Sequence, residues 1–213
     1  MEYLAQLFRA LANYERLRLL RLLAVFGELR VSELAAALSL QGAVVSVQVG
    51  VLSKANVVWK RRSGKAVFYR LAERPGSELL QQVIAVLRRA YAPISATTPA
   101  EVAAGASGGR SSPDAALFAC FTAFTHPRRL QLIRHLTTTG PAGLETLAVA
   151  LSMSERACLR HLDKLARRGY LVRSSAGRNT LYGLVAGEDP LQQSLLTAVQ
   201  KVLGDRDIDD THI

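Results

Sequence analysis

Cysteine is scarce in this sequence, because Cys120 and Cys158 are the only two among 213 residues. Two thiols are too few to staple a secreted fold, and they form no close-spaced metal-ligand cluster with the histidines. Long apolar runs are missing too, since Arg21 interrupts the richest stretch, LLRLLAVF. A membrane span would need ~18 apolar residues. The start carries Glu2 and Glu15 in an amphipathic pattern rather than a basic leader, so we expect a cytoplasmic protein.

Catalytic motifs are also missing. The sequence contains no glycine loop of the kind that cradles phosphates, no nucleophile elbow and no zinc-protease helix. Its acidic residues are scattered without an obvious pair. We therefore expect no enzymatic activity and no cofactor.

Positive charge is what the sequence has in excess. Lys and Arg number 27 against 17 Asp and Glu, which gives a formal net charge of +10. Such a surplus indicates an anionic partner, nucleic acid first and a membrane surface second, and does not bear on the fold. Hydrophobic residues make up 49% of the chain, a proportion typical of globular proteins.

The chain contains two related halves. A shift of 113 residues aligns 7–71 with 120–184 without a gap, and 17 of the 65 pairs are identical. The matches are mostly apolar residues at helical spacing and turn glycines, which define a core and its corners. The segment 92–113 is rich in Pro, Gly, Ser, Thr and Ala, a composition typical of flexible linkers. We predict two similar domains at residues 1–91 and 114–204, joined by this linker and followed by an acidic tail at 205–213.

In each half, the residue pattern predicts four helices, then two strands, then a closing helix. In the second half, Asp114 is the candidate cap of the first helix, and Pro127 suits the first turn of the next. Ser154 is the candidate N-cap of a fourth helix that runs to Arg168, where Gly169 supplies a left-handed stop. A short helix, a tight turn, a longer helix and a basic hairpin form a winged helix-turn-helix. The predicted fold class is therefore mainly α with small β-hairpin wings (α+β).

Several stretches resemble the ArsR-type repressors, winged-helix regulators first known from arsenical resistance. LFRALANYERLRLLRLL at 7–23 and, more loosely, CFTAFTHPRRLQLIRHL at 120–136 are similar to the family's opening helices. SERACLRHLDKLARRGYLV at 154–172 is similar to its recognition helix and the start of its wing. The resemblance covers about 85 residues of each half. It implies a sequence-specific regulator of transcription that binds double-stranded DNA and represses by blocking polymerase access.

The metal ligands of that family are missing. Members that sense metals carry a Cys-x-Cys pair in the third helix, where the first half reads ELRVSELA, with Arg30 and Ser32 in place of the thiols. The second half reads PAGLETLA and also lacks Cys. Because arsenite, cadmium and lead need soft thiolate ligands, we expect no metal site of this kind.

The predicted recognition helix of the second half has a basic face. Cys158, Leu162 and Leu165 recur at helical spacing and should face the core. Polar and basic side chains on the opposite face suit contacts to bases and phosphates. The residues predicted to contact DNA are Ser154, Arg156, Arg160, His161 and Lys164, together with Arg173 and Arg178 of the wing.

The equivalent helix of the first half, GAVVSVQVGVLSKAN at 42–56, has no charge before Lys54. Val45, Val49 and Leu52 suffice to form an apolar stripe toward the core, so Val44, Val47 and Val51 should face outward. Gln41, Ser46 and Gln48 are candidate base contacts, and outward valines can meet thymine methyl groups. The alternatives are a protein-binding surface or a helix occluded in the assembly. Backbone contacts are expected from the first wing, through Lys60, Arg61, Arg62 and Lys65.

The sequence allows more than one assembly and more than one function. The two domains can form an intramolecular pseudo-dimer with non-identical half-sites, or tandem chains can form a homodimer. A linker of about 22 residues reaches on the order of 25 Å, which permits the first arrangement. The alternative function is a protein-interaction or non-specific DNA-binding module whose Val-rich helix binds a partner. Cys158 and Cys120 are interpreted as core residues, with a redox switch as the alternative.

Overall fold

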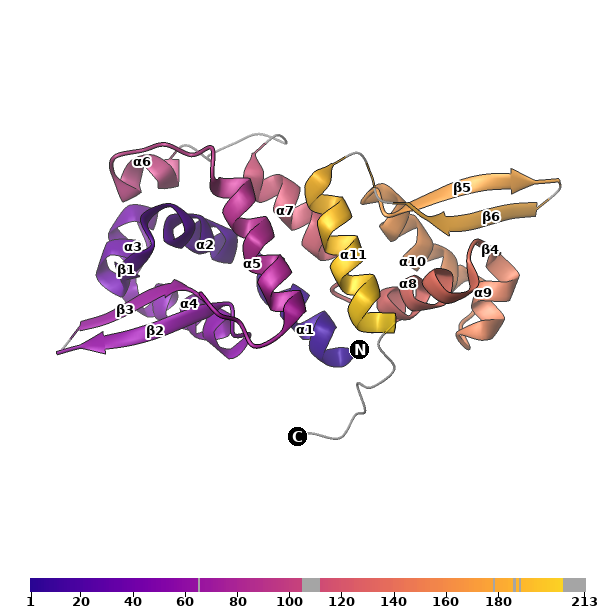
Figure 1. The fold of residues 1–213 in the computed structure, drawn as a ribbon, viewed down its shortest axis with the longest axis horizontal. Coiled ribbons are helices and arrows are strands. Elements are labelled where there is room, and N and C mark those ends of the chain that lie inside the picture. Colours follow the sequence, from indigo (N-terminus) through magenta and orange to yellow (C-terminus); the bar gives the residue numbers. More distant parts are fainter. Residues whose placement is uncertain (65, 105–111, 178, 186, 188, 205–213) are drawn as a thin grey trace. The chain divides into compact units, whose positions relative to one another are not determined.

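The computed structural model describes residues 1–64, 66–104, 112–177, 179–185, 187 and 189–204, and the predicted tail at 205–213 lies outside them. It confirms the predicted fold class, because helices predominate beside two small antiparallel sheets (Figure 1). Packing divides the chain into two compact units. The N-terminal unit is Gln6–Thr122, and the C-terminal unit comprises Met1–Ala5 and Ala123–Ile213.

The N-terminal unit contains a helix-turn-helix followed by a hairpin. The chain bends by 113° between α3 and α4, within the range of about 90–120° found in this motif. Strand β3 is central in the sheet, between β1 and β2. The elements are α1 (Glu2–Leu11), α2 (Tyr14–Phe26), β1 (Glu28–Arg30), α3 (Val31–Leu38), α4 (Gly42–Lys54), β2 (Val58–Ser63), β3 (Ala66–Leu71), α5 (Glu78–Tyr91), α6 (Pro99–Ala104) and α7 (Pro113–Thr122). Of α1, only the residues from Gln6 onward belong to this unit.

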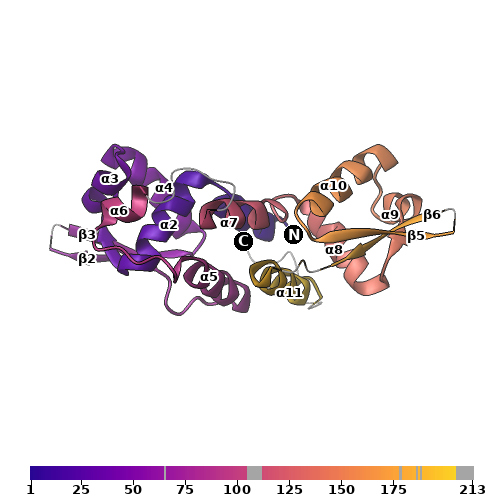
Figure 2. The same cartoon turned by 90° about the horizontal axis from the view of Figure 1, so that it is seen from above.

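The C-terminal unit repeats the order found from α2 to α5. Strand β6 is central in its sheet, between β4 and β5. The β5–β6 hairpin extends past the neighbouring helices, as a wing does (Figure 2). The elements are α8 (Pro127–Thr139), β4 (Ala142–Gly143), α9 (Leu144–Ala150), α10 (Glu155–Arg167), β5 (Leu171–Ala176), β6 (Asn179–Leu184) and α11 (Pro190–Gly204).

The expected start and stop signals of the second half are mostly confirmed. Pro127 occupies the first turn of α8. The Ser154 hydroxyl accepts a hydrogen bond from the Ala157 amide at 3.3 Å and so caps α10. Gly169 has φ +75°, the left-handed conformation that ends many helices and that glycine adopts without a Cβ penalty. The sequence did not indicate strands β1 and β4, which are too short for an alternating pattern.

The cap expected at Asp114 is wrong. Ser112 caps α7 instead, because its hydroxyl accepts a hydrogen bond from the Ala115 amide at 3.2 Å. The Asp114 side chain is buried, with the residue 4% exposed, and pairs with Arg21 of α2 at 2.8 Å. Its second carboxylate oxygen accepts a hydrogen bond from the Tyr91 hydroxyl of α5 at 2.9 Å. A buried charge needs such partners, so the carboxylate points into the unit rather than back at its own helix.

This buried network joins elements that are distant in sequence. It ties α7, the first helix of the second sequence repeat, to α2 and α5 of the first. Arg21 also donates to the Ala103 carbonyl at 3.3 Å, so the segment expected as a linker contains a packed helix, α6. In the same unit, the repeat-equivalent rings of Phe8 and Phe121 lie 6.0 Å apart. Packing and sequence repeat therefore divide the chain differently, and the domain limits read from the repeat stay a prediction.

Among the described helices, none is by itself both long and apolar enough to cross a bilayer, whereas α3 and α4 together, as a bent pair, reach the length and composition of a span.

Removing the Asp114 carboxylate should destabilise the N-terminal unit. Asp114→Ala leaves the Arg21 guanidinium buried without its anion, which typically costs about 3–5 kcal/mol. Urea unfolding of the full chain measures this loss. The matched control is Glu15→Gln, which breaks the partly exposed Arg18–Glu15 pair of the same helix and should cost less than about 1 kcal/mol. Equal losses in the two variants would contradict the role assigned to Asp114.

Candidate nucleic-acid interface

Helix α10 carries its charges on the side opposite the core. Cys158, Leu162 and Leu165 are all 0% exposed, as the periodicity predicted. These three positions fix the rotation of the helix, so the other positions of the wheel face away from the core. The exposed basic residues are Arg156, Arg160, Lys164 and Arg167. Four cations on one exposed helix face form an electrostatic surface that suits DNA.

His161 stands at the edge of this face and does not share its charge. Its ring centroid lies 4.6 Å from that of His126, the N-cap residue of α8. Burial, reinforced by His126 and by the nearby guanidinium of Arg129, lowers the pKa of His161 to about 4. In the chain without DNA the ring is therefore uncharged at neutral pH and adds no positive charge to the face.

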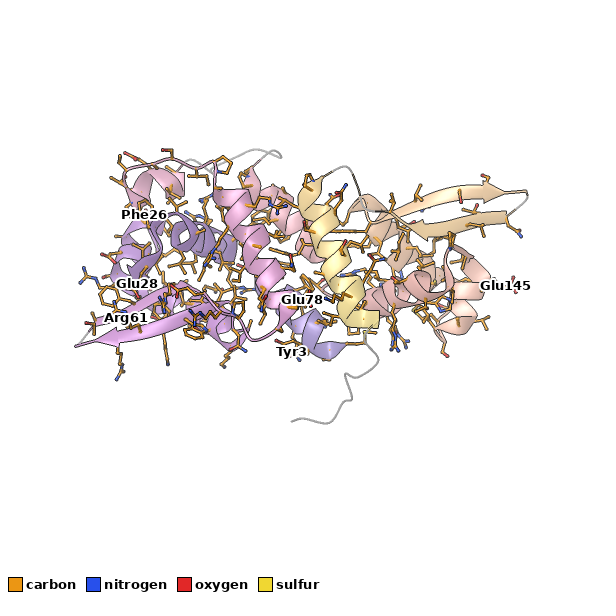
Figure 3. The ribbon with its side chains drawn as sticks, in the orientation of Figure 1. Tyr3, Phe26, Glu28, Arg61, Glu78 and Glu145 are labelled. Carbon is orange, nitrogen blue, oxygen red and sulfur yellow. The ribbon has the colours of Figure 1, made fainter. Side chains whose placement is uncertain are left out.

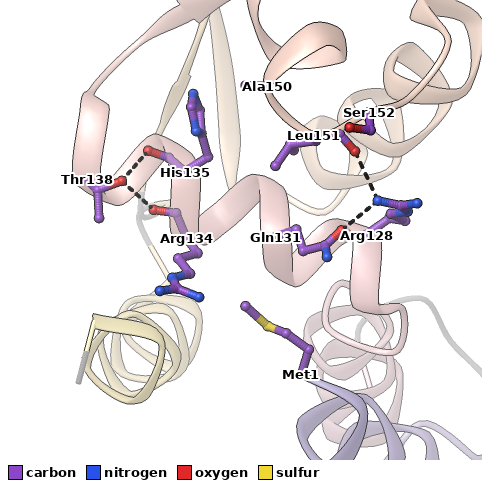
Figure 4. A pocket seen from close by; sticks show the side chains of 9 residues that line it. All are labelled: Met1, Arg128, Gln131, Arg134, His135, Thr138, Ala150, Leu151 and Ser152. Atoms are coloured by element: carbon purple, nitrogen blue, oxygen red, sulfur yellow. Dashed lines mark hydrogen bonds between the residues drawn. The ribbon is translucent and has the colours of Figure 1, made fainter. Parts of the chain in front are cut away.

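The turn between α9 and α10 is held by Arg128. Its guanidinium donates to the Leu151 carbonyl at 3.0 Å and to the Gln131 side chain at 3.1 Å (Figure 4). The contact satisfies a carbonyl at the end of α9, where helices leave carbonyls without partners. An open cavity of about 500 Å³ lies beside it, with Arg134 and His135 also in its lining. Arg128 thus helps to position α10 relative to the rest of the unit.

Helix α4 has the same construction with different chemistry. Val45, Val49 and Leu52 are 0% exposed and form its core stripe. Val47 is 64% exposed and Val44 is 40% exposed, as expected for outward valines. Helix α4 therefore presents methyl groups to solvent where α10 presents cations.

The polar candidates of α4 divide into two groups. Gln41 and Ser46 are exposed. Gln48 is half-buried, and its side-chain oxygen accepts a hydrogen bond from Arg16 of α2 at 2.9 Å. Arg16 also donates to the carbonyls of Ala10 and Arg9 at the end of α1. Gln48 therefore helps to anchor α4, which leaves less of its amide for base contacts.

The basic side chains in the wing of the N-terminal unit differ in whether they form an ion pair. Lys60 and Arg62 are exposed, and no ion pair is found for either one among the described residues. Arg61 instead donates two hydrogen bonds to Glu28 of β1, at 3.0 and 2.6 Å (Figure 3). Its guanidinium also lies 4.9 Å from the Phe68 ring centroid, and its hydrogen bond lowers the pKa of Glu28. Lys65 lies outside the described residues.

The wing of the C-terminal unit carries less available charge. Arg173 pairs with Asp163 of α10, and its guanidinium lies 5.7 Å from the Tyr182 ring centroid. Arg178 lies outside the described residues. The sequence predicted these wing arginines as DNA contacts but did not identify their carboxylate partners, because cross-strand and strand-to-helix pairs have no periodic signal.

Both cysteines lie in cores. Cys158 is 0% and Cys120 is 1% exposed, and neither forms a disulfide. Burial, with a smaller effect of Glu155, raises the pKa of the Cys158 thiol and so reduces its reactive thiolate. Within the described part of the chain, His, Cys, Asp and Glu side chains form no group of three that could hold a metal ion.

Oxidation should therefore have little effect on DNA binding. We expect mild peroxide to leave the affinity of the wild-type chain unchanged, because peroxide cannot reach a buried thiol easily. Cys158→Ser treated in the same way is the control. An affinity loss confined to the wild type would support the redox switch.

His161 should make the folded chain sensitive to moderate acid. Its pKa falls from an ordinary 6.5 to about 4 on folding, so the unfolded chain binds the proton first as pH drops. Stability contributed by the neutral ring is complete above about pH 6.5 and is lost toward pH 4. Thermal unfolding of wild type and His161→Gln between pH 7 and 4 measures the difference, with glutamine chosen because Gln48 occupies the equivalent position. Parallel curves for the two proteins would contradict the assignment.

The sequence is similar to named transcriptional regulators. It is 42% identical over 82 residues to the biofilm growth-associated repressor of Agrobacterium fabrum, covering 38% of this chain and 69% of that protein. It is 39% identical over 82 residues to the transcriptional repressor SmtB homolog of Synechocystis sp., covering 38% of this chain and 61% of that protein. An uncharacterized HTH-type transcriptional regulator of Mycobacterium tuberculosis is 40% identical over 86 residues, covering 40% of this chain and 75% of its own length. No family model matches the chain.

The printed name of the third relative, an HTH-type regulator, agrees with the helix-turn-helix geometry described above. Each unit contains a short helix, a turn, a longer helix with a three-residue core stripe, and a hairpin. The identities extend over about two thirds or more of two of the three relatives. The chain belongs to the ArsR-type family of winged helix-turn-helix transcriptional regulators.

Proposed function

We propose that this protein is a transcriptional repressor that binds a specific sequence of double-stranded DNA. The observation that carries the proposal is the exposed basic face of α10, set on a buried core stripe after a helix-turn-helix turn. The printed names of two relatives describe them as repressors, which supports the same role here. Repression then follows from occupying DNA that polymerase needs.

In this proposal α10 reads bases. Arg156 and Arg160 are four residues apart and project from the same side of the helix. Guanidinium groups are suited to the O6 and N7 acceptors of guanine in the major groove, so we expect guanine in the sequence that α10 reads. Ser154 lies at the start of the helix, where side chains of a recognition helix meet base edges. Lys164 contributes charge along the same face.

The wings contact the phosphate backbone. Lys60 and Arg62 are the strongest candidates, because both are exposed and neither forms an ion pair with another described residue. Arg61 and Arg173 must leave or share a carboxylate before they bind phosphate. These contacts provide affinity and position, whereas sequence selection comes from the helices.

The two units provide two unequal recognition helices on one chain. We propose that the two units form an intramolecular pseudo-dimer and bind one asymmetric DNA site. The two halves of that site should then differ in sequence. Selection from a randomised duplex pool, followed by affinity measurements at several salt concentrations, tests the proposal. An enriched site with a steep salt dependence supports it. A perfect palindrome would favour a homodimer of chains, and salt-sensitive binding without enrichment would contradict sequence-specific repression.

Base-reading and backbone-contacting residues should respond differently to substitution. Arg160→Ala should weaken binding to the selected site by about 1–3 kcal/mol and relax the preference at one position. Arg62→Gln should weaken binding to all duplexes alike and reduce the slope of log affinity against log salt by about 1. Fluorescence anisotropy titrations measure both effects. Arg89→Gln, which removes an exposed charge from α5, is the control and should change neither quantity.

A further inference from the structure

The outward positions of α4 and α10 correspond one to one. The shift of 113 residues that relates the two sequence repeats also aligns these helices, and the three core positions of each fall at the same places. The positions that face away from the core can therefore be compared directly. In α4 they are Ala43, Val47, Gly50, Val51 and Lys54, and in α10 they are Arg156, Arg160, Asp163, Lys164 and Arg167. Val44 lies at the flank of this face, 40% exposed, where α10 has Ala157.

We propose that α4 reads thymine-rich double-stranded DNA, through contact between the methyl groups of Val47 and Val44 and the 5-methyl groups of thymine. The inference rests on the proposed function and deepens it, because it gives the N-terminal unit a base preference of its own. In the major groove thymine is the base that presents a methyl group, and apolar side chains recognise it by packing. A face of valines suits that base and offers no donor fork to guanine.

Hydrogen bonding on this face is limited to few groups. Ser46 and Gln41 are exposed, whereas the Gln48 oxygen already accepts a hydrogen bond from Arg16 at 2.9 Å. Helix α4 contains no acidic residue, so its methyl face is not shielded from phosphates by like charge. Lys54 of the same helix and Lys60 and Arg62 of the wing supply exposed cations. An apolar strip beside basic side chains suits DNA, because the cations can contact phosphates while the methyl groups pack against thymine.

Gly50 provides a separate observation. Glycine in the middle of a helix weakens the helix, so its presence needs a reason. A Cβ built at Gly50 would have no neighbouring atom within 4 Å, so packing inside the protein does not require glycine there. At the equivalent position of α10 stands Asp163, which pairs with Arg173. A missing side chain on the outward face lets the backbone of α4 approach a ligand closely, as a helix inserted in the major groove does.

Deoxyuridine provides the direct test, because it differs from thymidine only in lacking the 5-methyl group. In the duplex selected by the full chain, we replace thymidine by deoxyuridine in each half of the site separately. Affinity should fall by about fourfold for each contacted methyl group, the value that corresponds to burying one methyl-sized group. The loss should occur in one half of the site only. Val47→Ala should lose part of this deoxyuridine effect, and the double variant Val44→Ala/Val47→Ala should bind the thymidine and deoxyuridine duplexes with similar affinity.

Two further variants complete the experiment. Val149→Ala is the matched control, since Val149 of α9 is a valine 75% exposed outside both recognition helices, and it should keep the full deoxyuridine effect. Gly50→Ala should raise the melting temperature of the free protein while weakening its binding to the selected duplex. An unchanged or lowered melting temperature would contradict the claim that glycine at position 50 weakens α4.

The outcomes separate this inference from the proposed function. If a sequence is enriched but deoxyuridine has no effect in either half, thymine reading by α4 is overturned and the repressor proposal stands. If Val47→Asp also leaves affinity unchanged, the valine face is free in the DNA complex and suits a protein partner instead. If no sequence is enriched at all, the proposed function itself fails.

Discussion

The ion pair between Arg21 and Asp114 is the constraint on which the N-terminal unit depends. An arginine in the middle of α2 is buried, and its charge has to be met inside the protein. Asp114 meets it from α7, with the Tyr91 hydroxyl of α5 on the second carboxylate oxygen. Burial raises the pKa values of Asp114 and Tyr91, because a charged form of either group is costly there. This ion pair fixes the position of α2. Arg16 of α2 in turn donates a hydrogen bond to Gln48 and so helps to anchor α4.

Two helices with the same scaffold differ in what they present. In both, three buried residues fix the rotation. Two helices earlier, Arg16 of α2 and Arg129 of α8 lie near the start of their helix, and each donates to a carbonyl at the end of the helix before it. The residues on the outer face are not constrained by packing, so they are free to differ. Cations and methyl groups at equivalent positions suit different bases. One chain with two such helices can bind an asymmetric sequence that two identical helices would not match.

Much of the fold follows from periodicity, and most of the side-chain pairing does not. The core stripes of α4 and α10, the Ser154 cap and the Gly169 stop depend on neighbours within one or two turns, so the sequence predicted them. Asp114 was predicted as a cap because the same reasoning cannot detect a partner 93 positions away. The lowered pKa of His161 depends on burial and, to a smaller degree, on the ring of His126, the N-cap residue of α8. The candidate site was therefore predicted as a set of positions, without the contacts that decide which of them are available.

Mapping each helix on bound DNA tests most directly whether both helices read one site. Gly42→Cys and Glu155→Cys place thiols at equivalent exposed positions at the starts of α4 and α10, whereas the native cysteines are buried. An iron chelate attached to each thiol cleaves nearby DNA through hydroxyl radicals. Two reading helices on one chain predict cleavage in different halves of the selected duplex for the two proteins. Cleavage from Glu155→Cys alone, or the same pattern from both, would contradict this arrangement.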